Sequence, residues 1–162
     1  MSAALVVGLG SVDRGDDAVG PAVAHAVAER GLPGVHVVEH EDPTALLDLW
    51  ADHDLVVVVD AIRSGEPPGT IHQLETGAGA PPMPAAAWSA TGRGGTHAFG
   101  LAAAVELARA LRRLPPRLVI VGVEAAGFDY AEPLTGPVAA AVPRATARVL
   151  TVLEGVTSGV SW

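Results

Sequence analysis

The run Leu-Val-Val-Val-Val-Asp at residues 55–60 constrains the fold more than any other feature of this chain. Its consecutive β-branched residues favour an extended strand, and the lack of alternating polar residues indicates burial on both faces. Strands of this kind are typical of parallel sheets that helices cover. The run therefore predicts a central parallel strand that ends in an acid, Asp60.

Elsewhere in the chain, segments of strand and helix pattern alternate. Strands are expected at residues 4–9, 35–39, 55–60, 69–74 and 118–123. Helical spacing of apolar residues is found at 19–30, 43–50, 97–113 and from 135 to about 154. Too few residues separate the third strand from the fourth for a helical crossover, which predicts that the fourth strand is antiparallel.

This alternation predicts an α/β fold of three layers (α/β/α) around a mostly parallel, twisted, five-stranded sheet. Residues 1–162 are expected to form a single domain, with a frayed tail at 155–162. Residues 75–96 lack periodicity and are rich in Gly, Pro, Ala and Ser, so they are expected to form a loop that covers a site or is disordered.

Composition narrows the classes of function. The absence of cysteine excludes disulfides, thiolate metal sites and a cysteine nucleophile. A formal net charge of −8 opposes binding to phosphate backbones, so no nucleic-acid partner is expected. No basic leader opens the chain and no apolar run reaches the roughly 20 residues that cross a bilayer, so we expect a cytoplasmic protein without a membrane partner.

Acidic residues gather where two of the predicted strands end. Asp16 and Asp17 follow the first strand, and Asp60 ends the third. Ligands of open α/β sheets bind beyond the carboxyl ends of the strands. One member of the acidic pair can cap the first helix, but a cap accounts for neither the other member nor Asp60. Converging carboxylates repel one another unless a cation or a shared proton lies between them, so a cation site or an acid/base site is predicted.

His97 begins the predicted helix at 97–113, directly after Thr96, which is expected to be its N-cap. Imidazole is a common metal ligand and would complete an Asp/Asp/His set that leaves coordination positions open for substrate. The alternative is a solvent-exposed histidine at a helix start. His40 is expected beside the site as a support or substrate contact, and His72 is expected to face solvent.

A dinucleotide-binding turn is a second interpretation, based on Gly8 and Gly10 after the first strand. The position of the fingerprint's third glycine is taken by Asp13, whose carboxylate would repel a pyrophosphate, although Glu39 or Glu41 could bind a ribose. A simpler interpretation is that the two glycines permit a tight strand-to-helix turn. The sequence contains neither a Gly-x-Ser-x-Gly elbow nor a phosphate loop.

Three blocks together resemble the hydrogenase maturation proteases, the endopeptidases that process the large subunit of nickel–iron hydrogenases. They are the strand, glycine turn and acidic pair at 6–20, the strand Leu-Val-Val-Val-Val-Asp-Ala-Ile at 55–62, and Thr-His-Ala-Phe-Gly-Leu at 96–101. Their order and spacing fit over nearly the whole chain, including Gly-Val-Glu at 122–124.

The resemblance implies a phosphorylase/hydrolase-like fold, in which Asp17, Asp60 and His97 contact nickel and carry out catalysis. The supporting or substrate-loop residues are Gly10, Ser11, Asp16, Thr44 and Thr96. It also implies that the protein docks on a nickel-loaded large-subunit precursor and removes its C-terminal extension by aspartic-type or metal-assisted hydrolysis. Nickel then belongs to the substrate, although another divalent cation can use the same ligands. A metal-binding maturation chaperone without peptidase activity is the further alternative.

Two positions depart from the family's pattern. Ser11 stands where the family often has Asn, and a serine can still donate a hydrogen bond. Glu-Asp-Pro-Thr at 41–44 replaces a Gly-Gly-Thr segment, of which only Thr44 remains. Asp42 and Pro43 are expected to stiffen and acidify this loop.

Overall fold

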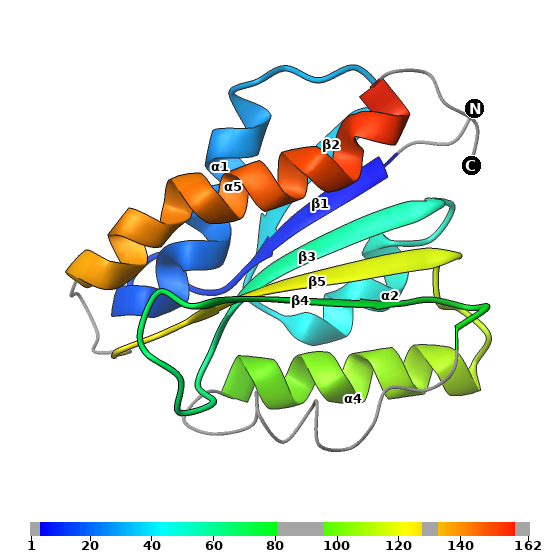
Figure 1. The fold of residues 1–162 in the computed structure, drawn as a ribbon. Coiled ribbons are helices and arrows are strands. Elements are labelled where there is room, and N and C mark those ends of the chain that lie inside the picture. Colours follow the sequence, from blue (N-terminus) through cyan, green and yellow to red (C-terminus); the bar gives the residue numbers. More distant parts are fainter. Residues whose placement is uncertain (1–3, 81–95, 128–132, 158–162) are drawn as a thin grey trace.

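The structure is a computed structural model that describes residues 4–80, 96–127 and 133–157, with side chains omitted at 96–99 and 155–157. One five-stranded sheet forms its centre (Figure 1). The strands are β1 (Ala4–Leu9), β2 (Val35–His40), β3 (Leu55–Ile62), β4 (Ile71–Thr76) and β5 (Arg117–Glu124). Their spatial order is β2-β1-β3-β5-β4, and β4 alone is antiparallel to its neighbour.

Helices cover both faces of the sheet. They are η1 (Gly15–Ala18), α1 (Val19–Ala28), η2 (Pro43–Ala45), α2 (Leu46–Leu49), α4 (Thr96–Ala110) and α5 (Gly136–Thr157). Helices α1 and α5 lie on one face and α2 and α4 on the other (Figure 1). The predicted three-layer α/β/α fold with one antiparallel strand is therefore confirmed. Within the described ranges, no helix is both long and apolar enough to cross a membrane.

The predicted boundaries differ from the structure at several elements. The helix expected at 43–50 is a 3-10 turn followed by one α-helical turn. The fourth strand begins at Ile71 rather than at residue 69, because Gly69 adopts φ +89°. Helix α5 continues to Thr157, past the residue where fraying was expected. Residues 158–162, and most of the predicted loop at 75–96, lie outside the described residues.

Strand β3 contributes to two hydrophobic cores, one on each side of the sheet. Val57 and Val59 pack in the core under α1 and α5, and Val56 and Val58 pack in the core over α2 and α4. All four side chains are fully buried. Burial of a valine contributes about 1.5–3 kcal/mol, so the run that predicted a central strand is also a main source of its stability.

The carboxyl ends of β1, β3 and β5 lie along one edge of the sheet, because these strands are parallel and in register. Asp60 pairs with Gly122, and Ile62 pairs with Glu124. The chain leaves β1 toward β2 on one side and leaves β3 toward β4 on the other. This reversal makes the gap between β1 and β3 the topological switch point, where open α/β sheets bind ligands.

The first turn of α1 lies directly on this edge. A Cβ atom added at Gly20 would lie 2.4 Å from the Leu9 carbonyl oxygen and 2.5 Å from that of Val59. One added at Gly8 would lie 2.4 Å from the Gly20 carbonyl oxygen. Such distances exclude any side chain larger than hydrogen without movement of the helix. The two glycines therefore hold η1, and its acids, close to the switch point.

Candidate functional site

Asp17 lies in η1, at the start of the helical segment that follows β1. Its side chain is buried, and its Oδ2 accepts a hydrogen bond of 2.9 Å from the backbone N–H of Ser11. Gly10 has φ +143°, and a Cβ there would lie 2.1 Å from the Asp17 carbonyl oxygen. The turn from residue 10 to residue 17 thus closes on itself, and the predicted supporting residues Gly10 and Ser11 are the ones that close it.

The expectation that Asp16 or Asp17 caps the first helix is wrong. The N-cap residue of α1 is Ala18, and that of η1 is Arg14; neither has a side-chain cap hydrogen bond. The 3-10 turn explains the difference. Because η1 lies between the glycine turn and α1, both acids sit within a helical turn rather than ahead of it.

Asp16 joins η1 to the connection between β5 and α5. It is fully buried, and its Oδ2 accepts hydrogen bonds from the N–H groups of Ala126 at 2.7 Å and Gly127 at 3.1 Å. Its Oδ1 accepts one from the Thr135 N–H at 2.7 Å, and the Thr135 hydroxyl also donates to the carboxylate. A buried carboxylate with this many donors is well stabilised. Asp16 therefore ties η1 to this connection through contacts that the sequence did not reveal, and its supporting role at the site stays a prediction.

Asp60 occupies the β3 position at the switch point. Its side chain is fully buried, and its Oδ1 accepts a hydrogen bond of 2.9 Å from the N–H of Ala61. Strand β3 contacts η1, the turn that carries Asp17. The structure thus brings both predicted acids to the same edge of the sheet.

The third predicted member, His97, lies in the first turn of α4 together with Thr96. A Cβ added at Gly100 would lie 3.0 Å from the Pro43 Cγ, so the start of α4 packs on η2, close after the carboxyl end of β2. The side chains of Thr96 and His97 lie outside the described residues, so their roles stay predictions. Among the side chains that are described, no three histidines or acids gather as metal ligands.

The loop after β2 is tied by its own side chains. Asp42 Oδ1 accepts hydrogen bonds from both the N–H and the hydroxyl of Thr44, at 2.9 and 2.8 Å. The N–H of Asp42 donates to His40 Nδ1 at 3.1 Å. These bonds, with Pro43 at the start of η2, agree with the expectation that Asp42 and Pro43 stiffen this loop.

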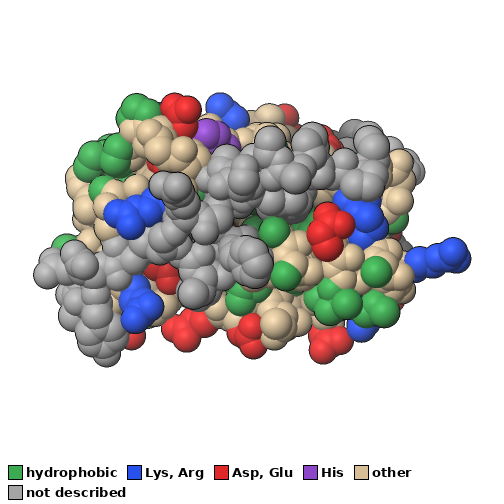
Figure 2. All heavy atoms as spheres, turned by 90° about the horizontal axis from the view of Figure 1, so that it is seen from below, with side chains coloured by type: hydrophobic (Ala, Val, Ile, Leu, Met, Phe, Trp, Pro, Cys, Tyr) green, Lys and Arg blue, Asp and Glu red, His purple; other side chains and the backbone are tan. Residues whose placement is uncertain are grey.

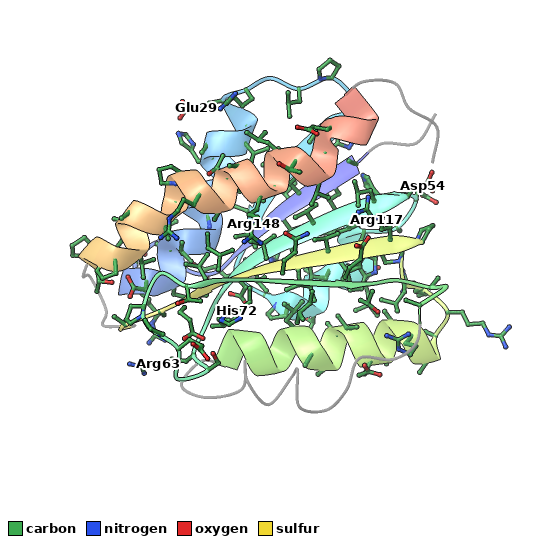
Figure 3. All side chains as sticks on the ribbon, in the orientation of Figure 1. Glu29, Asp54, Arg63, His72, Arg117 and Arg148 are labelled. Carbon is green, nitrogen blue, oxygen red and sulfur yellow. The ribbon has the colours of Figure 1, made fainter. Side chains whose placement is uncertain are left out.

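Glu124, at the end of β5, is a buried acid that the sequence analysis did not assign to the site. It accepts hydrogen bonds from the N–H and the hydroxyl of Ser64, in the connection after β3. His72 Nε2 lies 3.3 Å from its Oε1, on the α4 side of the sheet (Figure 3). His72 was expected to face solvent, but its ring nitrogen is buried against this carboxylate. The sequence does contain a signal for Glu124. Like Asp60, it is an acid at the end of an apolar run.

A hollow of about 380 Å³ opens beside the acidic turn. It is lined by Gly10, Val12, Pro21, Glu39, His40 and Glu41. This agrees with the expected position of His40 beside the site. A Cβ atom at Gly10 would collide with the Asp17 carbonyl, so the tight strand-to-helix turn by itself accounts for this glycine. The dinucleotide interpretation is therefore disfavoured.

A doubly wound α/β sheet with buried acids at its switch point defines a small α/β domain with a candidate ligand site at that edge. A family model described as HycI, hydrogenase maturation protease, matches residues 41–152. This match spans more than half of the chain. The chain therefore belongs to the hydrogenase maturation protease family, which places it among the peptidases.

Several solved structures are similar to this chain. The hydrogenase maturating endopeptidase HybD from E. coli is 29% identical, with 95% of this chain and 93% of that one covered at a TM-score of 0.75. An endopeptidase from Escherichia coli, solved in solution, is 28% identical, with 98% and 95% covered and a TM-score of 0.81. The NiFe hydrogenase maturation protease HybD from Thermococcus kodakarensis, at 20% identity, 94% and 99% coverage and a TM-score of 0.70, shares the fold. No curated protein matches the chain.

Proposed function

We propose that this protein removes the C-terminal extension of a nickel–iron hydrogenase large-subunit precursor and recognises the precursor by its nickel. The observation that carries the proposal is the burial of Asp60 and Asp17 at the switch point of the sheet. Membership in the maturation protease family supplies the reaction class and the precursor as substrate.

The chemistry of the proposed step is the hydrolysis of one peptide bond. It needs a positioned water, a base that takes a proton from it, and stabilisation of the oxyanion. Asp60 or Asp17 supplies the base, and the Ser11 N–H keeps the Asp17 carboxylate in a fixed orientation. Nickel enters with the substrate and is bound by these acids and His97. In an aspartic-type reaction the metal only anchors the precursor, whereas in a metal-assisted one it polarises the scissile carbonyl.

The proposal is tested by incubating the protein with nickel-loaded and nickel-free precursor and following release of the tail by mass spectrometry. We expect release only from the nickel-loaded form. Asp60→Asn is expected to slow release about 100-fold or more, because a nickel ligand and one of the two candidate bases are lost together. His97→Ala is expected to abolish release while the far-UV circular dichroism spectrum is unchanged.

The matched control is Asp54→Asn, an exposed acid just before the amino end of β3, which should cut at the wild-type rate (Figure 3). Wild-type binding of the loaded precursor without tail release would refute the peptidase and favour the chaperone alternative. Release at the wild-type rate by His97→Ala would remove His97 from the site.

A further inference from the structure

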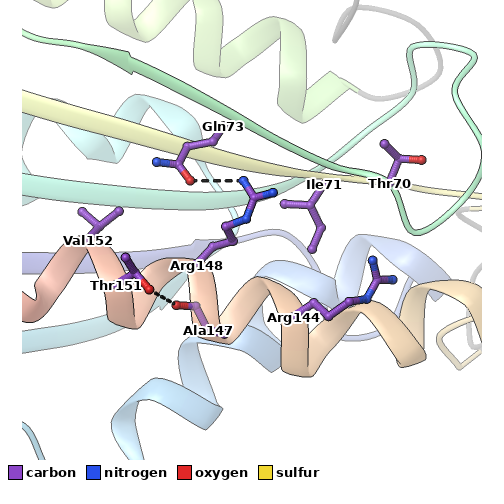
Figure 4. Close-up of a pocket in the computed structure, with 8 residues that line it drawn as sticks. All are labelled: Thr70, Ile71, Gln73, Arg144, Ala147, Arg148, Thr151 and Val152. Carbon is purple, nitrogen blue, oxygen red and sulfur yellow. Dashed lines mark hydrogen bonds between the residues drawn. The ribbon is translucent and has the colours of Figure 1, made fainter.

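A second surface of the molecule is suited to binding a peptide. A groove of about 640 Å³ runs between β4 and α5, on the face of the sheet away from α4 (Figure 4). Ile71 and Val152 give it an apolar lining, and Gln73, Arg144 and Arg148 give it a polar one. None of these residues belongs to the acidic site.

Strand β4 forms one wall of the groove and is the last strand of the sheet. Within the described ranges, no strand pairs with its outer edge. The Glu124 N–H donates to the Thr70 carbonyl, so the backbone of Thr70 faces β5. In an antiparallel pair, every second residue from there along β4 also faces β5, and the residues between them face away from it. The N–H and C=O groups of Ile71, Gln73 and Glu75 therefore point outward. Such an edge accepts an extended peptide as an added strand.

Helix α5 forms the other wall and presents two arginines to the groove. Arg144 and Arg148 are one helical turn apart and exposed. Arg144 donates to the Gly69 carbonyl and Arg148 to Gln73 Oε1, each at 3.4 Å. Both acceptors are neutral, and no carboxylate of the described residues forms an ion pair with either guanidinium. In a chain with 18 acidic and ten basic residues, this pair of cations marks a site for an anionic partner.

The spacing of the two arginines matches that of an extended peptide. Four residues of α-helix rise about 6 Å, and alternate residues of a strand, which point to the same side, are about 6.6 Å apart. Two carboxylates separated by one residue in a strand beside β4 can therefore reach Arg144 and Arg148 together. Guanidinium groups are well shaped for such pairs because they bind carboxylates through two parallel hydrogen bonds.

We propose that this groove binds an extended acidic segment of the hydrogenase precursor, added to β4 as a further strand with alternate carboxylates on Arg144 and Arg148. The proposal rests on the proposed function and extends it, because it adds a docking surface separate from the acids at the switch point. Recognition of the precursor then depends on two surfaces of the protease rather than on nickel alone.

The first test uses synthetic peptides and requires no catalysis. A fluorescein-labelled octapeptide of alternating threonine and glutamate is titrated with the full-length protein at low salt, and its anisotropy gives Kd. We expect the double variant Arg144→Glu, Arg148→Glu to raise Kd at least tenfold, and 0.5 M salt to weaken wild-type binding. The control is Arg30→Glu, an exposed arginine in the turn after α1, which should leave Kd unchanged.

The docking proposal fails if the corresponding lysine peptide binds as tightly as the glutamate peptide, or if Arg30→Glu weakens binding as much as the double variant. Far-UV circular dichroism confirms that the variants fold.

With the loaded precursor, the double variant is expected to raise KM at least fivefold while kcat changes less than twofold. If the wild type binds the glutamate peptide but cuts no precursor, the docking surface stands and the peptidase proposal fails.

Discussion

Two adjacent acids have different surroundings at this site. Asp16 is directed into the protein and accepts hydrogen bonds from the connection that follows β5. Asp17 is held by the turn that follows β1 and lies at the switch point. The acidic pair of this chain therefore combines a structural anchor with a candidate reactive group.

Removal of the anchor is expected to destabilise the fold. Asp16→Ala leaves the N–H groups of Ala126, Gly127 and Thr135 without their carboxylate acceptor, and each buried unsatisfied donor costs about 1–3 kcal/mol. We expect the free energy of unfolding in urea to fall by about 2–4 kcal/mol. Asp16→Asn should lie between this value and the wild type, because the amide keeps one acceptor oxygen.

Asp13→Ala is the control for this experiment, since Asp13 belongs to the same turn and is exposed. Its effect should stay within about 0.5 kcal/mol. Equal loss of stability in Asp13→Ala and Asp16→Ala would contradict the anchoring role.

For single residues, the sequence predicted which side chains belong to the candidate site. It did not predict what those side chains contact. Asp60 could be predicted because an acid at the end of an apolar run is a local signal. The partners of Asp16 could not, because Ala126 and Thr135 lie 110 and 119 residues away and come close only in the folded chain. Glu124 carried the same local signal as Asp60, but its contacts with Ser64 and His72 depend on the pairing of β3, β4 and β5.

Among the elements, α1 is the one whose position decides whether the site forms. Gly20→Ala places a methyl group against the carbonyl oxygens of Leu9 and Val59, which forces α1 and η1 away from the sheet. We expect an unfolding free energy lower by about 1–3 kcal/mol and slower tail release. Chemical denaturation and the precursor assay measure the two effects.

Gly136→Ala is the matched control, because a Cβ atom at Gly136 meets open space at the start of α5. It should leave both stability and tail release close to the wild type. A Gly20→Ala protein that is as stable and as active as Gly136→Ala would show that α1 does not need its close approach.

Strands could be predicted more closely than helices. The apolar runs at 55–60 and 118–123 mark strands buried on both faces, and both were found. The helix expected at 43–50 was divided, because Asp42 and Pro43 start a 3-10 turn that only then becomes α-helical. A periodic pattern of apolar residues does not distinguish these two kinds of helical turn.

In the molecule as a whole, one sheet separates two hydrophobic cores, and β3 contributes to both. We propose that the chain is one domain and expect it to unfold in a single cooperative transition. The calorimetric and van't Hoff enthalpies should then agree. Two resolved heat-absorption peaks would mean that the two cores unfold separately.

The groove between β4 and α5 could not be predicted from the sequence, although both of its walls could. Gln73 and Arg148 are 75 residues apart and form one surface only because β4 lies at the edge of the sheet beside α5. A surface that two elements form together can be predicted only when the packing of those elements is known.

The bond between Asp16 and Thr135 also determines when the site can form during synthesis. Both acids of the pair leave the ribosome early, but the groups that hold Asp16 follow more than a hundred residues later. A nascent chain that stops before residue 135 contains both acids and lacks part of the clamp that fixes them. We therefore expect the acidic site to be complete only once residue 135 has been synthesised and can bind Asp16.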